Sequence, residues 1–200
     1  MSSRPLQAVR VQEEVTPRPS LPSKRRNAIV RLGSSNTPAA RRALRRLLQT
    51  AESSTERAAA ALQLGRSSDP TSTRSLLQAL RDPSRTVRCA AAGSLRWDSR
   101  PEVCDALAAV LADSSEYASV RSIAAESLGE LGCRRAANAL LRALQDPSPR
   151  VRLAAAFAVG NLKLLAARAP LRRLLADRTR VARHGSVAAT AARALAQIGT

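Results

Sequence analysis

Aspartates recur along this 200-residue chain at a nearly constant interval, and that recurrence restricts the fold more than any other feature. Steps of 31, 33 and 31 residues separate Asp82, Asp113, Asp146 and Asp177. Each of the first three follows a segment with leucines at helical spacing and precedes a Val-Arg pair that opens an Ala-rich segment. A period of this length is typical of solenoids, in which every repeat contributes one helical hairpin.

A second spacing fixes the boundaries of the repeats. The apolar residue that ends each Ala-rich helix stands twelve residues before the one that opens the next helix, in the pairs Leu32–Leu44, Leu64–Leu76, Leu95–Leu107, Leu128–Leu140 and Val159–Leu171. This register predicts five helical hairpins behind one leading helix that begins near Pro22. Length then varies in the turn within each hairpin, where an insertion costs little chain entropy.

The composition agrees with closely packed helices. Apolar residues make up 44% of the chain, yet there is one Trp, one Tyr and one Phe. Ala and Leu have high helix propensity, and no stretch alternates with period two as a strand would. We therefore predict an all-α solenoid over residues 21–200. Residues 1–20 are basic and contain several prolines, so we expect a disordered tail there.

One motif carries a family resemblance. The pattern Asp-x(4–6)-Val-Arg-x-x-Ala-Ala-x-x-Leu-Gly is most complete from Asp113 to Gly129. It resembles the HEAT-like repeats of the phycobilisome (bilin) lyase type, and the resemblance covers nearly everything after residue 21. It implies a right-handed α-solenoid of antiparallel hairpins, with the first helix of each hairpin on the convex side and the second on the concave side.

The same resemblance implies a structural ladder between neighbouring repeats, formed by the turn aspartate and the arginine of the Val-Arg pair. Its expected members are Asp82, Asp113, Asp146, Asp177, Arg57, Arg88, Arg121 and Arg152. Arg25 stands where the ladder would start. Position 188 is alanine, so the ladder should end before the last repeat. A guanidinium can bond a carboxylate and turn carbonyls together, which suits this role.

The concave side is the candidate partner-binding surface. Counted from the Val position of each second helix, offsets 0, 4 and 8 face the core, while offsets 2 and 6 face away. These outward positions are mostly small and apolar, which favours a protein surface or a peptide helix as partner. The candidate contact residues are Leu62, Glu126, Leu153, Phe157 and Arg193. The alternative for Phe157 is local packing beneath a neighbouring loop.

The formal net charge of +18 attracts polyanions in general. When the ladder arginines are excluded, the remaining positive charge is concentrated at Arg41, Arg42, Arg45 and Arg46 and at Arg172 and Arg173. These positions are convex or terminal, which favours a solubilising face. Weak contact with nucleic acid or an acidic protein is the alternative, although the clusters lack the aromatic side chains that stack on bases.

The segment SLRWDSRPE, residues 94–102, departs from the repeat because Arg96 replaces the expected glycine. We expect Trp97 to cover the altered turn, and a partner hot spot is the alternative. HEAT-like alkylpurine DNA glycosylases hold a nucleotide with tryptophans and an aspartate. Adjacent helical residues point about 100° apart, so Trp97 and Asp98 should not share such a pocket.

The sequence contains few combinations of residues that could form an active site or a metal site. Cys89, Cys104 and Cys133 form no CxxC pair, so we expect no disulfide framework, no zinc site and a reducing cytoplasm. His184, the one histidine, precedes a glycine and cannot supply the His-Glu pairs of the iron-binding HEAT-like hydroxylases. No apolar run reaches the length of a membrane span. We therefore expect no catalytic residues, metal or cofactor.

The sequence thus favours a non-catalytic scaffold or adaptor that binds a protein on its concave face. One alternative is a bilin lyase or chaperone-like subunit acting on phycobiliproteins. Another is a nucleic-acid- or ribosome-associated basic protein. The last helix, SVAATAARALAQIG, has one charged residue, and an apolar terminal repeat predicts docking against a second copy of this chain or another protein.

Overall fold

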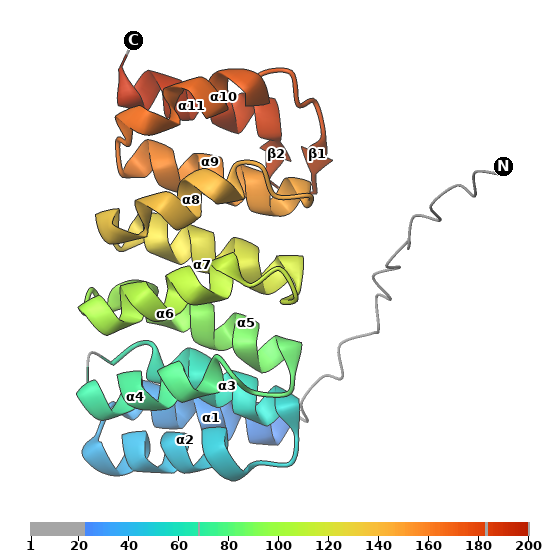
Figure 1. The fold of residues 1–200 in the computed structure, drawn as a ribbon. Coiled ribbons are helices and arrows are strands. Elements are labelled where there is room, and N and C mark those ends of the chain that lie inside the picture. The colour runs from blue at the N-terminus through green and yellow to red at the C-terminus, as the bar shows by residue number, and fades with distance from the viewer. Residues whose placement is uncertain (1–22, 68, 183, 200) are drawn as a thin grey trace, which may run out of the picture.

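The computed structural model describes residues 23–67, 69–182 and 184–199, and shows a stack of helical hairpins (Figure 1). A leading helix, α1 (Ser23–Ser35), packs against the first hairpin. The first helices of the five hairpins are α2 (Pro38–Thr50), α4 (Pro70–Ala79), α6 (Pro101–Ala112), α8 (Ala137–Ala143) and α10 (Arg168–Leu174). The second helices are α3 (Ser54–Leu64), α5 (Arg85–Ser94), α7 (Ala118–Glu130), α9 (Pro149–Asn161) and α11 (Val187–Ile198). The predicted all-α solenoid of five hairpins and a leading helix is confirmed.

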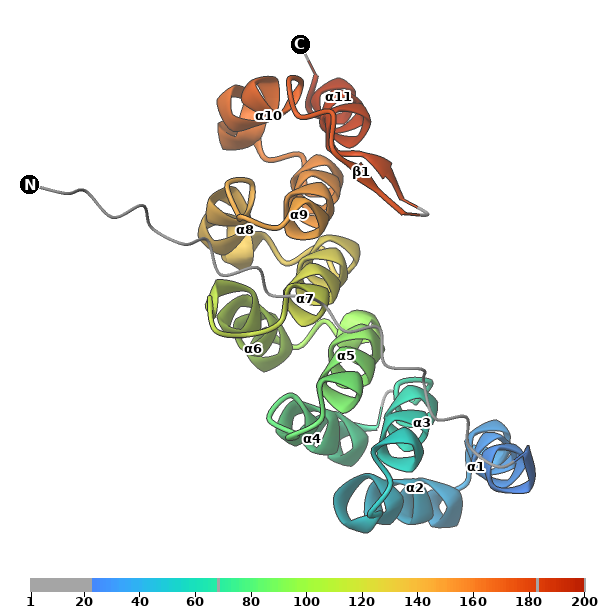
Figure 2. The ribbon, with the colours of Figure 1, turned by 90° about the vertical axis from the view of Figure 1, so that its right-hand side faces the viewer.

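Two rows of helices make up the stack. Figure 2 shows the second helices, together with α1, along the inner side of a curve and the first helices along its outer side. We call these the inner row and the outer row. Three short 3₁₀ segments join them: η1 (Leu95–Trp97), η2 (Arg134–Ala136) and η3 (Leu165–Ala167).

Local sequence explains where several helices begin. Proline occupies the first turn of α2, α4, α6 and α9, where its fixed φ suits the helix and its missing N–H is not needed. Side-chain oxygens cap three helices: Thr37 accepts from Ala40 N at 3.2 Å, Asp69 from Ser72 N at 3.0 Å, and Ser186 from Ala189 N at 3.2 Å. Each bond satisfies a backbone donor that the first turn leaves free.

The core lies between the two rows. The apolar residues that fixed the twelve-residue register are at most 3% exposed, except Leu32 in the leading helix, and are Leu44, Leu64, Leu76, Leu95, Leu107, Leu128, Leu140, Val159 and Leu171. Glycines let inner-row helices approach closely. A Cβ built on Gly129 would lie 2.6 Å from Ala158 Cα, so a larger residue would force α7 and α9 apart.

Arg96 occupies the position after α5 that corresponds to Gly129 in α7, and it lies in the 3₁₀ segment η1. The Arg96 side chain turns back along the helix, since Nε donates to Gly93 O at 2.8 Å. It also forms an ion pair with Glu130 on α7 at 3.2 Å. The charged residue thus links the two inner-row helices where a glycine would have brought them together.

A disulfide joins Cys104 on α6 to Cys133 after α7, with the two Cα atoms 5.9 Å apart. The expectation that the cysteines form no disulfide is therefore wrong. The two residues are 29 positions apart, close to one repeat, so stacking brings them together although no short motif contains both. Disulfides persist mainly in oxidising compartments, which removes the cysteine-based argument for a reducing cytoplasm.

The final hairpin contains the largest departure from the repeat. Between α10 and α11, β1 (Arg180–Val181) pairs antiparallel with β2 (Gly185–Ser186), and Val181 faces Gly185. Figure 2 shows this β-hairpin projecting on the inner side of the stack. Among the helices of the described ranges, none is both long and apolar enough to cross a membrane.

Candidate protein-binding surface

A stripe of side chains runs along the inner row, one from each helix. It consists of the residues at offset 6, namely Val30, Leu62, Gly93, Glu126, Phe157 and Arg193. We call it the inner stripe. Val30 is 45% exposed, Leu62 55% and Phe157 37%. Three large apolar side chains therefore face solvent in equivalent positions of three repeats. Phe157 is not enclosed by a neighbouring loop.

Leu153, the other apolar residue expected on this surface, is instead 7% exposed and belongs to the core. The prediction for Leu153 is wrong. Its equivalents at offset 2 in two other inner-row helices, Ala58 and Ser122, are 6% and 2% exposed, so this offset is buried in other repeats as well. β1 also packs against α9, the helix that carries Leu153.

Glu126 gives the middle of the inner stripe a half-buried carboxyl group. Burial raises the pKa of Glu126 above its ordinary value, while interactions with His184, Arg96 and Arg150 act in the opposite direction. Glu130 adds to the rise. Arg193, at the end of the stripe on α11, is exposed. Both polar residues expected on this surface thus lie on it.

The predicted ladder arginines of the inner-row helices link successive repeats. Arg57 donates from Nε and Nη2 to both carboxylate oxygens of Asp82, at 2.8 and 2.9 Å, and from Nη1 to Ala51 O and Glu52 O. Arg121 bonds Asp146 at 3.0 and 3.1 Å, and Arg152 forms an ion pair with Asp177 at 2.7 Å. Arg25 begins the series on Glu56 at 2.8 Å.

Arg88 departs from the expected partner. It bonds both oxygens of Glu116, at 2.6 and 2.8 Å, rather than Asp113. Asp113 lies seven positions before Val120, whereas Asp82 and Asp146 lie five positions before Val87 and Val151, and this longer spacing moves Asp113 away from the arginine. Asp113 instead accepts from Ser115 N at 2.9 Å and Ser115 Oγ at 2.6 Å, and these bonds lower its pKa. Glu116 therefore replaces Asp113 in the ladder.

The two arginine clusters lie at opposite ends of the solenoid, on α2 and α10 (Figure 1). Part of the first cluster is engaged in the fold. Arg45 forms an ion pair with Asp69 at 3.3 Å, and Arg41 donates to Asn36 O at 2.7 Å. Arg42, Arg46, Arg172 and Arg173 are exposed. The structure thus does not bring the clusters together into one basic surface.

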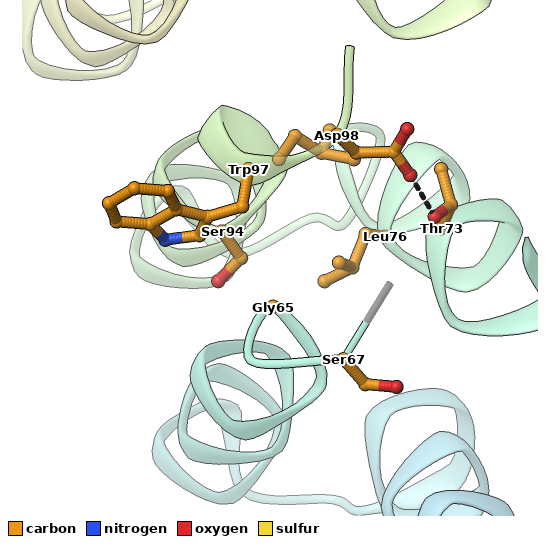
Figure 3. Close-up of a pocket in the computed structure, with 8 residues that line it drawn as sticks. Gly65, Ser67, Thr73, Leu76, Ser94, Trp97 and Asp98 are labelled. Atoms are coloured by element: carbon orange, nitrogen blue, oxygen red, sulfur yellow. Dashed lines mark hydrogen bonds between the residues drawn. The ribbon is translucent and has the colours of Figure 1, made fainter. Parts of the chain in front are cut away.

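Trp97 is 74% exposed, so the expectation that it covers the turn is wrong. Its ring forms one wall of a small hollow between the ends of α3 and α5 and the start of α4, which is partly open to solvent. Figure 3 shows Trp97 and Asp98 on opposite sides of it. The two neighbours share this hollow because Asp98 has left helical geometry, with φ −121° and ψ 100°.

Within the described part of the chain, no three His, Cys, Asp or Glu side chains gather where they could hold a metal ion. His184 is exposed on the β-hairpin. Cys89, the free cysteine, is half-buried, and burial raises the pKa of its thiol, which keeps it protonated at neutral pH.

Three structural features escaped the sequence analysis. The Glu116 contact could have been predicted from the spacing of the acidic residues. Asp113 lies seven positions before Val120 rather than five, whereas Glu116 lies four positions before it and has a longer side chain that can replace the aspartate. The Cys104–Cys133 pair could have been found from a separation close to one repeat. The β-hairpin could have been predicted from the interval of ten positions from Asp177 to Val187, since the intervals that begin at Asp82, Asp113 and Asp146 are five or seven positions.

Comparison with known proteins places these features in a family. The sequence profile described as HEAT repeats matches residues 48–119 and 112–191. No curated protein matches the chain significantly. Among solved structures, the chain is similar to the complex of CpcE and CpcF of phycocyanin lyase from Nostoc sp. PCC7120, with 24% identity, TM-score 0.59, and coverage of 90% of this chain and 77% of that chain.

Two further structures share the architecture. Human deoxyhypusine hydroxylase is 22% identical, with TM-score 0.58 and coverage of 85% of this chain and 66% of that chain. A designed armadillo repeat protein in complex with the peptide (KR)4 is 17% identical, with TM-score 0.55 and coverage of 89% and 95%. These similarities concern the fold. Together with the profile match across most of the solenoid, they show that this chain belongs to the HEAT-repeat family.

Proposed function

We propose that this protein is a non-catalytic scaffold or adaptor that holds a protein partner along the inner stripe. The observation that carries the proposal is the exposure of Val30, Leu62 and Phe157 at equivalent positions of the inner row. Burying exposed apolar side chains of this size against a partner is favourable.

The scaffold also has the rigidity that such a role requires. Ladder arginines tie each turn to the next repeat, and the disulfide ties α6 to the turn after α7. A surface held in this way loses little conformational freedom on binding, which favours affinity. Structures of similar fold include a complex of two proteins and a complex with a peptide, which supports a binding role.

The experiment is affinity purification from the source cells after nuclease treatment and washing at moderate salt. The test variant carries Leu62→Asp and Phe157→Asp. The matched control is Leu175→Asp, because Leu175 is 45% exposed at the end of α10 in the outer row. The proposal predicts one stoichiometric protein that the control retains and the double variant loses. Equal recovery with both variants would exclude the inner stripe as the binding surface.

A second candidate is a bilin lyase or chaperone-like subunit that acts on phycobiliproteins. It is supported by the motif from Asp113 to Gly129 and by the similarity to the CpcE and CpcF complex. Co-expression with a phycobiliprotein subunit and a bilin tests it through the visible absorbance of the attached chromophore. Chromophore attachment that depends on this chain would favour this candidate over a general adaptor.

A third candidate is binding of nucleic acid or an acidic protein through the exposed arginines of α2 and α10. Salt separates it from the first proposal, because electrostatic binding weakens steeply as salt rises, whereas apolar contacts persist. A complex that survives nuclease but is lost when Arg42 and Arg46 are changed to Ser would favour an acidic protein at this end. These two residues are exposed and lie outside the ladder.

We also propose that the C-terminal edge docks against another copy of this chain or a different protein. Ala189, Ala192 and Ala196 are exposed on α11, the last helix of the described residues. Sedimentation of the wild type and the Ala192→Glu variant over a range of concentrations tests this. Self-association that the glutamate abolishes would support a homodimer, whereas a monomer at all concentrations would exclude it.

A further inference from the structure

The C-terminal part of the solenoid carries a large excess of positive charge. Residues 149–200 contain ten Lys and Arg residues but a single acidic residue, Asp177. Arg152 already engages Asp177 in the ladder, through an ion pair at 2.7 Å. The other cations of this region therefore have no carboxylate within it to pair with.

Two of these arginines flank Phe157 on the inner side of the solenoid. Arg150 is exposed at the start of α9, seven residues before Phe157, and this spacing places both on the same face of the helix. Arg193 is exposed at the position equivalent to Phe157 on α11, the helix that packs against α9. Phe157 thus has one exposed arginine on its own helix and another on the neighbouring helix.

The β-hairpin adds positive charge to the same surface. Val181 of β1 is buried and β1 packs against α9, so Arg180, whose side chain points to the opposite face of the strand, is exposed. His184 is exposed and interacts electrostatically with Glu126, so the hairpin extends over α9 toward α7 on the inner side (Figure 2). We name the C-terminal patch by its five residues, Arg150, Phe157, Arg180, His184 and Arg193.

The arginines of the C-terminal patch have no counter-charge in the described part of the chain. No carboxylate there forms an ion pair with Arg150, Arg180 or Arg193. Glu126 is the one acidic residue of the inner stripe, and it bounds the patch on the side of α7. Because a carboxylate repels negative charge, an anionic occupant is favoured on the α9 and α11 side of Glu126.

We propose that the C-terminal patch receives an acidic segment of the protein partner, with carboxylates on its arginines and an apolar side chain on Phe157. The inference rests on the proposed function and specifies the chemistry of the partner at one end of the inner stripe. Charge complementarity carries it, because exposed cations without internal partners attract and orient an acidic surface. Nucleic acid is disfavoured, because single-stranded nucleic acids bind where several aromatic rings accompany the basic residues, and this patch has one ring.

Three probes separate these occupants. Two are fluorescein-labelled peptides with leucines at the same positions, one with glutamate and the other with lysine at the remaining positions. The third is a labelled single-stranded oligonucleotide with the same net charge as the glutamate peptide. Each is titrated with the full chain at moderate salt and followed by fluorescence anisotropy. We expect saturable binding of the glutamate peptide and no binding of the lysine peptide.

The test variant carries three changes in the patch, Arg150→Ser, Arg180→Ser and Arg193→Ser. The matched control carries three changes at exposed positions of α8 and α10 in the outer row, Arg142→Ser, Arg172→Ser and Arg173→Ser. Both variants lose the same charge, so attraction by net charge alone weakens equally in both. We expect the test variant to bind the glutamate peptide about tenfold more weakly and the control to stay within about twofold of the wild type.

An equal loss in both variants would overturn the inference, because binding would then follow the net charge. It would also be overturned by a lack of saturable binding of the glutamate peptide, or by tighter oligonucleotide binding that the test variant loses. Its failure is distinguishable from that of the adaptor proposal. A purified partner that the Leu62→Asp, Phe157→Asp variant loses but the patch variant binds at full affinity would exclude this inference and leave the adaptor proposal standing.

Discussion

Arg88 on α5 donates from two guanidinium nitrogens to both carboxylate oxygens of Glu116, 28 residues later in the chain. Its third nitrogen donates to Asp82 O at 2.8 Å and Pro83 O at 3.1 Å. One side chain therefore joins the turn of its own hairpin to the turn of the next. The ring of Tyr117 adds a cation–π contact, with Arg88 Cζ 5.8 Å from its centre.

Removal of this contact should destabilise the solenoid. Glu116→Ala leaves the largely buried Arg88 without its carboxylate, and we expect a loss of about 2 kcal/mol in the free energy of unfolding. Asp113→Ala is the control, because Asp113 is exposed and bonds Ser115 rather than an arginine. It should change stability by about 0.5 kcal/mol or less. Urea unfolding checks both, and equal effects would contradict the assignment of Glu116 to the ladder.

The ladder also predicts that stability falls in acid. Burial raises the pKa values of Asp82, Glu116 and Asp177, but hydrogen bonds from arginines, a threonine hydroxyl and backbone N–H groups outweigh it, so each lies below its ordinary value. The folded state therefore binds fewer protons than the unfolded state. The contribution is complete above the unfolded pKa values, about 4, and is lost as pH falls through the folded ones.

Urea midpoints measured from neutral pH downward test this sign. We expect little change to about pH 5 and a decline below it. The Glu116→Ala variant should show a shallower decline than the wild type, since one of the titrating groups is gone. Parallel curves for the two proteins would show that the ladder does not cause the acid sensitivity.

Ser94 is buried, and its Oγ has no hydrogen-bond partner among the described residues. The equivalent serine of the next repeat provides a matched control. Ser127 is also buried, but its Oγ donates to Ala92 O at 2.9 Å. Ser127→Ala should lower stability by about 1 kcal/mol because it leaves a buried carbonyl unbonded, whereas Ser94→Ala should be neutral or stabilising. Thermal unfolding of both variants checks the difference. A larger loss in Ser94→Ala would mean that Ser94 has a partner in solution.

The Cys104–Cys133 bond should contribute to stability when formed. Cross-linking residues 29 positions apart restricts the unfolded chain, and we expect about 3 kcal/mol less stability in the Cys104→Ser, Cys133→Ser variant. Mass spectrometry after thiol alkylation shows directly whether the bond exists, and Cys89 serves as the internal reference for a free thiol. Alkylation of all three cysteines in non-reduced protein would contradict the bond.

Repetition explains why so much of the fold could be predicted. Leu64, Leu95 and Leu128 end successive second helices and are fully buried, because each occupies the same place between the two rows. The same regularity led to the arginine ladder. Where the chain follows the repeat, one correctly assigned helix determines the burial of its neighbours.

Most of the errors fall where the chain departs from the repeat. The two extra positions between Asp113 and Val120 moved this aspartate away from Arg88, which bonds Glu116 instead. Leu153 is a different case, because its equivalents Ala58 and Ser122 are buried as well, and the helical wheel wrongly placed offset 2 on the surface. At Trp97 the loss of a glycine produced a 3₁₀ turn whose side chain faces solvent instead of covering the turn. A pattern averaged over all repeats cannot predict such features, because each depends on the backbone path of a single repeat.

The most direct test of the adaptor proposal is the dissociation constant of the purified partner for three proteins: the wild type, the Leu62→Asp, Phe157→Asp variant and the Leu175→Asp control. Unfolding midpoints of all three proteins are measured first, because Phe157 is only 37% exposed and binding is compared only between folded proteins. The account predicts at least about tenfold weaker binding by the double variant and unchanged binding by the control. Unchanged binding by the double variant, or an equal loss in the control, would contradict it.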